Sequence, residues 1–229
     1  MAYILAIETS TAICSIALHR SGELIGLLES GQQGVHAERI MLMIEEVLQA
    51  AHLDFGDLNA VAVSEGPGSY TGLRIGVSTA KGIAYAQNIP LIAVSPLLAL
   101  AAQVNLHGQE WVVPMMDARR MEVYRVVLDS QGNQVEDLVP EIVDASSYSF
   151  YLERGKVYFV GDAVEKVKQV LLHPNAVFLS DTPFSAAHYG QISFESFQKR
   201  EFVDVAYFVP NYLKEFKAFQ SKKNPLLSL

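Results

Sequence analysis

The feature that most restricts the fold of this chain is an order of elements that occurs twice. An apolar run at 4–7 ends at Glu8 and is followed by two strand-like runs joined by a turn at Gly22. A second apolar run at 112–116 ends at Asp117 and is followed by two strand-like runs joined at Gly132. Each glycine lies at nearly the same distance past its acid. The repetition predicts two lobes related by internal duplication.

Elsewhere the apolar residues take the spacing of helices. After residue 35, six of them follow the i, i+3, i+4, i+7 pattern of an amphipathic helix: Ile40, Met43, Ile44, Val47, Leu48 and Ala51. Further helices are predicted at four places: 71–87, from residue 95 on, near 163–172 and near 185–199. Strands that alternate with helices predict an α/β fold with mixed, mostly parallel sheets flanked by helices.

The same pattern predicts how the chain is divided. We expect an N-terminal lobe at 1–104 and a C-terminal lobe at 105–207, which the helix near 185–199 completes. The last segment, 208–229, is expected to return toward the N-terminal lobe.

Composition restricts partners and location. Half of the 229 residues are hydrophobic and 18% are charged, so much apolar surface must be buried in a core or against a partner. The formal net charge of −8 argues against a broad nucleic-acid-binding surface, because phosphate repels an acidic protein. Cys14, the only cysteine, cannot form an intramolecular disulfide. The N-terminus does not resemble a signal peptide and no stretch suits a membrane span, so we expect a cytoplasmic protein.

Two segments could bind phosphate. In GPGSYTGLRIG, residues 66–76, Gly68 permits a sharp turn and Ser69 or Thr71 could cap the following helix, which would leave free N–H groups for an anion. The spacing fits neither known phosphate-binding fingerprint, so an ordinary tight turn is the alternative. Glu8, Thr9 and Ser10, with Asp117 as the counterpart in the second lobe, could hold nucleotide and magnesium, or could simply cap turns.

Small residues recur along the predicted second helix. Gly72, Gly76 and Ala80 lie every four residues, with Thr79 beside them. Such a stripe allows close approach of another element. From the residues alone, it either packs on the sheet of its own lobe or docks a helix of a partner.

No catalytic constellation is evident. The six histidines do not form H-x-x-x-H or H-E-x-x-H, so no metal site is predicted in this chain. Four lysines against one acid, Glu215, make the C-terminal tail basic: Lys214, Lys217, Lys222 and Lys223. The tail is either a solvated end or a contact for RNA or an acidic partner.

Several segments together resemble the TsaB (YeaZ) family of bacterial tRNA threonylcarbamoyladenosine biosynthesis proteins. They are, in chain order, ILAIETST, HAER, GPGSYTGLRIGVSTAKGIA, PMMDARRMEVY and PNYLK. The resemblance spans nearly the whole chain but is concentrated in the first 125 residues, and residues 144–201 carry nothing diagnostic. It implies the actin/Hsp70-like ATPase fold with two duplicated lobes.

The resemblance also implies a role. The chain would be a non-catalytic scaffold or activator that pairs with a larger TsaD-type paralogue, which holds the metal and the transfer site. A TsaE-type ATPase would join the complex, which places a threonylcarbamoyl group on adenosine 37 of tRNAs reading ANN codons. tRNA would be bound through the complex, and ATP or ADP and a metal ion would belong to the complex, none held tightly by this chain.

Docking in this family uses the first two helices. The resemblance therefore implies an interface that includes Met41, Met43, Gly72, Ile75, Gly76 and Thr79. Because this face is apolar, the chain is expected to form a homodimer when alone. Gly76→Arg is expected to weaken pairing with the paralogue and to leave the fold intact.

Three rival functions are open. One is a small kinase or ATPase of the same fold that uses Glu8, Asp117 and the GPGSYTG turn. The second is a peptidase, a label attached to relatives of the family, which the missing metal pair and nucleophile triad oppose. The third is a homodimeric binding module without a dedicated partner.

Overall fold

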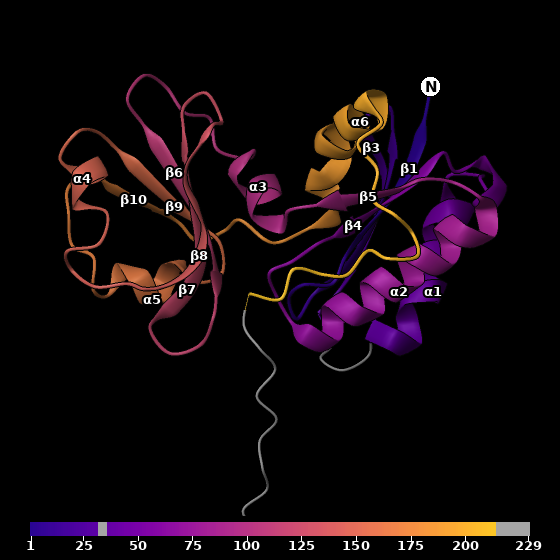
Figure 1. The fold of residues 1–229 in the computed structure, drawn as a ribbon, viewed down its shortest axis with the longest axis horizontal. Coiled ribbons are helices and arrows are strands. Elements are labelled where there is room, and N and C mark those ends of the chain that lie inside the picture. Colours follow the sequence, from indigo (N-terminus) through magenta and orange to yellow (C-terminus); the bar gives the residue numbers. More distant parts are fainter. Residues whose placement is uncertain (32–35, 214–229) are drawn as a thin grey trace, which may run out of the picture.

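The computed structural model describes residues 1–31 and 36–213. They form two lobes that lie side by side, each with a five-stranded sheet at its centre (Figure 1). The basic tail and the final part of the 208–229 segment, from residue 214 on, lie outside the described residues.

The first lobe has the strands β1 (Tyr3–Glu8), β2 (Cys14–Arg20), β3 (Glu23–Ser30), β4 (Ala60–Ser64) and β5 (Leu91–Val94). Their order in the sheet is β3-β2-β1-β4-β5. β1 pairs antiparallel with β2 and parallel with β4, and β1, β2 and β4 are almost wholly buried because both faces of the sheet are covered.

Helices α1 (His36–Ala50) and α2 (Tyr70–Gln87) lie together over one face of this sheet (Figure 1). The apolar spacing of α1 is explained here, since Ile40, Ile44 and Val47 are buried against the sheet. α2 begins after Ser69, whose hydroxyl accepts a hydrogen bond from the Gly72 amide, and ends at Asn88 in the left-handed conformation. The 3₁₀ turn η1 (Phe55–Asp57) precedes β4, and α3 (Pro96–Ala101) leads toward the second lobe.

The second lobe repeats this topology. Its elements are β6 (Trp111–Asp117), β7 (Glu122–Asp129), β8 (Gln134–Ile142), α4 (Ser149–Leu152), β9 (Val157–Val160), α5 (Val164–Lys168) and β10 (Ala176–Leu179). The sheet order β10-β9-β6-β7-β8 is that of the first lobe read from the other edge. In each sheet, two pairings are parallel and two antiparallel, so the sheets are mixed and parallel pairings make up half. The prediction of two lobes with one duplicated topology is confirmed.

The chain returns to the first lobe earlier than the sequence suggested. The turn η2 (Ala186–Tyr189) and helix α6 (Gly190–Lys199) pack on the first sheet, opposite α1 and α2. Ala186 and Tyr189 share a core cluster with Ile4 and Ala6 of β1. Assigning the helix near 185–199 to the second lobe, and the return to residue 208, was wrong. The physical reason is that this apolar face needs a cover, which the second lobe does not supply.

After α6 the chain stays on the first lobe. Val203 forms an isolated bridge with Leu91, and Val205 and Phe208 pack against the core under α1 and α2. The described residues contain no helix that is long and apolar enough to cross a membrane.

Candidate functional site

The two candidate phosphate loops of the first lobe pack directly on each other. The Thr9 hydroxyl donates to the Gly72 carbonyl over 2.8 Å, and the Ser69 amide donates to the Ser10 carbonyl over 2.6 Å. A Cβ atom at Gly72 would overlap the carbonyl oxygen of Thr9, and one at Gly68 would overlap that of Ser10. The glycines therefore allow the Thr9–Ser10 turn to approach the backbone closely.

This packing uses the donors that a phosphate would need. The Ser69 amide is bonded to Ser10, the Gly72 amide to the Ser69 hydroxyl over 3.2 Å, and the Ser10 amide to the carboxylate of Glu8. An amide that already donates within the protein offers little to an anion. The geometry favours the ordinary tight turn over the phosphate cradle.

Glu8 itself is wholly buried at the end of β1. Its carboxylate accepts hydrogen bonds from the Ser10 amide and the Tyr189 hydroxyl. Burial raises the pKa of Glu8, although these hydrogen bonds lower it in part. Burial also raises the pKa of Tyr189, and the neighbouring Glu8 adds to that shift. A carboxyl group enclosed in this way does not fit a magnesium–nucleotide site.

Asp117, the counterpart acid of the second lobe, is already paired. Lys166 donates to its Oδ1 over 2.7 Å, and the Arg119 amide donates to the same oxygen over 2.6 Å. Burial acts to raise the pKa of Asp117, but the bonds to Lys166 and Arg119 outweigh it and hold the pKa below the usual value. Lys166 and Tyr189 are the partners that sequence reasoning missed, because both lie far along the chain.

Asp117 is not among the residues that line the crevice beside Glu8. The crevice beside Glu8 is lined by residues such as Leu100, Gln103 and Phe184, and it has essentially no room for even a water molecule. Small-molecule sites usually span roughly 300–1,000 Å³. Within 1–31 and 36–213, no group of three His, Cys, Asp or Glu residues could hold a metal ion.

The small-residue stripe of α2 faces inward. Gly72 and Gly76 are buried, and a Cβ atom at Gly76 would overlap the Thr9 hydroxyl. Met43 of α1 is also buried, in the core between the helices and the sheet. These three residues do not lie on the outer surface, contrary to the docking surface predicted from the sequence. The expectation that Gly76→Arg leaves the fold intact was also wrong, because the position has no room for a side chain.

The outer face of α1 and α2 consists of other residues. Met41, Leu42 and Tyr85 are 41%, 62% and 84% exposed, and Ile75 and Thr79 are half-buried beside them. A second small-residue stripe lies outward on α2, with Ser78, Gly82 and Ala86 all exposed. We call these eight residues the outer helix face. The interface predicted from the sequence lacks five of them: Leu42, Ser78, Gly82, Tyr85 and Ala86. The four-residue spacing of Ser78, Gly82 and Ala86 was the available signal.

Comparison with known proteins identifies the family. The family model "TsaD: tRNA N6-adenosine threonylcarbamoyltransferase" matches residues 32–223, which is most of the chain. The chain is 32% identical to the tRNA threonylcarbamoyladenosine biosynthesis protein TsaB of Bacillus subtilis, over 96% of this chain and 99% of that protein.

Two further relatives agree. The TsaB protein of Haemophilus influenzae is 43% identical over 53% of this chain, and the matched part spans about half (51%) of that relative. The solved structure of YeaZ from Pseudomonas aeruginosa is 26% identical, with a TM-score of 0.76, and the match covers 93% of this chain and all of that one. The chain therefore belongs to the TsaB (YeaZ) family of tRNA threonylcarbamoyladenosine biosynthesis proteins.

Proposed function

We propose that this chain is a non-catalytic subunit that docks a TsaD-type paralogue and activates its transfer of a threonylcarbamoyl group to adenosine 37 of tRNA. The observation that carries the proposal is the contrast between its two candidate sites. The loops that could bind nucleotide are closed by internal hydrogen bonds, whereas the outer helix face leaves large apolar side chains in solvent. Such a surface suits a protein partner.

The fold supports a paralogue as that partner. A family model of the TsaD type matches most of this chain, so a TsaD-type protein has the same domain and can present the same pair of helices. Two such faces can pack as a four-helix layer around a pseudo-twofold axis. Ser78, Gly82 and Ala86 would let the helices approach closely, and Met41 would adapt to the partner's shape.

The remaining components belong to the assembled complex in this proposal. ATP or ADP and a metal ion are held by the paralogue, a TsaE-type ATPase joins the pair, and tRNA is bound by the complex in the cytoplasm. Without the paralogue, two copies of this chain would cover the same apolar face and form a homodimer.

The rival enzymatic functions have less support. A kinase or ATPase would need Glu8 and Asp117 to be free for nucleotide and metal, and both are engaged. A Pseudomonas aeruginosa protein of similar structure is described as similar to a peptidase. For peptidase activity here, Cys14 is a poor nucleophile, because it is buried and burial raises the pKa of its thiol to about 11.

The test is size-exclusion chromatography with light scattering, on this chain alone and mixed with the TsaD-type paralogue of the same cell. We expect a heterodimer peak. Gly82→Arg should abolish it, because it places a large charged side chain on an exposed position that has no neighbour within 4 Å. Ala145→Arg, at an exposed position of the second lobe, is the matched control and should pair normally. If the wild-type chain and paralogue do not associate, the scaffold function is wrong. If Gly82→Arg pairs normally, the outer helix face is not the interface.

A further inference from the structure

The turn between β6 and β7 holds two consecutive arginines in the left-handed backbone region. Arg119 has φ +73° and Arg120 has φ +53°. In this region the Cβ atom of an L-residue crowds the backbone, so glycine and asparagine are the residues usually found there. A sequence chosen only to make the turn would use them. The backbone of this turn therefore does not account for arginine at either position.

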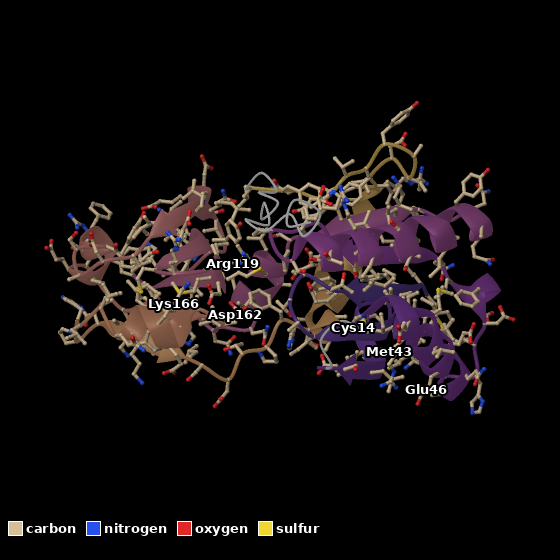
Figure 2. The ribbon with its side chains drawn as sticks, turned by 90° about the horizontal axis from the view of Figure 1, so that it is seen from below. Cys14, Met43, Glu46, Arg119, Asp162 and Lys166 are labelled. Carbon is tan, nitrogen blue, oxygen red and sulfur yellow. The ribbon has the colours of Figure 1, made fainter. Side chains whose placement is uncertain are left out.

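Lys166 of helix α5 supports the turn through hydrogen bonds. The Lys166 ammonium group donates to Asp117 Oδ1 over 2.7 Å, to the Arg120 carbonyl over 2.9 Å and to the Glu122 carbonyl over 2.7 Å. The Arg119 amide is fixed by the same carboxylate of Asp117. Figure 2 labels Arg119, Asp162 and Lys166, which lie near one another in the second lobe. The side chain of Lys166 is only 17% exposed, so these hydrogen bonds are partly shielded from solvent.

The arginine side chains are open to solvent. Both residues are exposed, and neither has a salt bridge to another residue of the described ranges. The nearby acids are engaged elsewhere, since Asp117 is paired with Lys166 and Asp162 accepts a hydrogen bond of 2.7 Å from the Asp117 amide. The turn thus presents two exposed guanidinium groups, of which that of Arg119 also attracts the Asp117 carboxylate.

We infer that Arg119 and Arg120 contact the phosphate backbone of the tRNA in the assembled complex. Guanidinium groups bind phosphate oxygens in a bidentate way, and a turn whose backbone is already held by hydrogen bonds loses less entropy on binding. The chain carries a net charge of −8, so two local cations can supplement the RNA contacts of a partner without making this chain an RNA-binding protein by itself. This inference rests on the proposed function.

The decisive variant is Arg119→Asn with Arg120→Gly. These residues suit the left-handed region, so the melting temperature should stay equal to that of the wild type or rise. Binding of fluorescently labelled tRNA to the wild-type and variant heterodimers is measured by anisotropy at several KCl concentrations. We expect the variant to bind on the order of tenfold more weakly near 0.15 M salt, and the slope of log K against log[salt] to fall by about 1 to 2.

Lys168→Gln is the matched control, because it removes an exposed cation of the same lobe from α5. It should change neither the affinity nor the slope. An unchanged affinity and slope in the double variant, with the heterodimer intact, would overturn this inference and leave the proposed function standing. Loss of the heterodimer in the double variant alone would make the turn a protein contact and also overturn it. Absence of a wild-type heterodimer would remove the proposed function and this inference with it.

A second measurement separates RNA from free nucleotide. ATP and inorganic phosphate are titrated into wild type and double variant by calorimetry. If the inference is correct, the wild type and the double variant give the same calorimetric result with ATP and with phosphate. Binding of ATP or phosphate by the wild type that disappears in the double variant would assign the turn to a small phosphate ligand instead of RNA.

Discussion

The hydroxyl group of Tyr189 donates a hydrogen bond to the carboxylate of Glu8, although 181 positions separate the two residues in the sequence. Glu8 ends the first strand, and Tyr189 ends the turn by which the chain returns from the second lobe. Both side chains are buried. The pair therefore fastens the returning segment to the end of β1, the central strand of the first sheet.

Removing the hydroxyl should weaken this attachment. In Tyr189→Phe, the buried carboxyl group of Glu8 loses a partner, and we expect the free energy of unfolding to fall by about 1–3 kcal/mol. Urea denaturation measures the change. Tyr207→Phe is the control, because Tyr207 is 84% exposed and its loss should be nearly neutral. Equal stability of the two variants would mean that the Glu8–Tyr189 bond contributes nothing.

The same carboxyl group predicts a pH dependence of stability. Burial raises the pKa of Glu8 in the folded protein above its unfolded value near 4.5, so the folded state keeps this proton to higher pH. The stabilising contribution is complete below that value and is lost as pH rises through the folded pKa. Glu8→Gln stays neutral. Its stability relative to the wild type should therefore increase between pH 4.5 and 8, as measured by urea denaturation. A constant difference across this range would contradict the raised pKa.

Two glycines of α2 should respond in opposite ways to the same substitution. Gly76→Ala puts a methyl group against the Thr9 hydroxyl and should lower stability by about 1–3 kcal/mol. Gly82→Ala meets nothing within 4 Å on an exposed part of the helix and should raise stability by about 0.5–1 kcal/mol. Thermal denaturation of both variants tests this. Similar effects of the two substitutions would refute the inward and outward assignment.

The hydrogen bonds of Lys166 at the β6–β7 turn give another prediction. Lys166→Met keeps an unbranched side chain of similar length but removes three donated hydrogen bonds, and should lower stability by about 1–3 kcal/mol. Lys168→Met, on the exposed side of the same helix, should change little. Urea denaturation compares the two. If Lys166→Met is as stable as Lys168→Met, the turn is held by other contacts.

The sequence by itself determined most of the elements and their order, although the short helix α4 was not predicted. The apolar run at 4–7 became part of β1, and the helix predicted at 71–87 became α2 at Tyr70–Gln87, because periodic burial and capping act over a few residues. The sequence also predicted that one strand order occurs on both sides of residue 105, because the strands of each lobe pair within a sheet of their own. The sequence motifs were also enough to identify the TsaB (YeaZ) family.

Only the tertiary structure decided what covers each face of the helices and sheets. A four-residue spacing groups Gly72 with Gly76 and Ser78 with Gly82, but it does not say which group meets the sheet and which meets solvent. The periodicity of 185–199 predicts a helix, but not the lobe on which it packs. The partners of Glu8 and Asp117 lie 181 and 49 positions away. Local sequence sets the conformation of a segment, whereas its partners depend on how distant surfaces bury one another, and no local pattern encodes that.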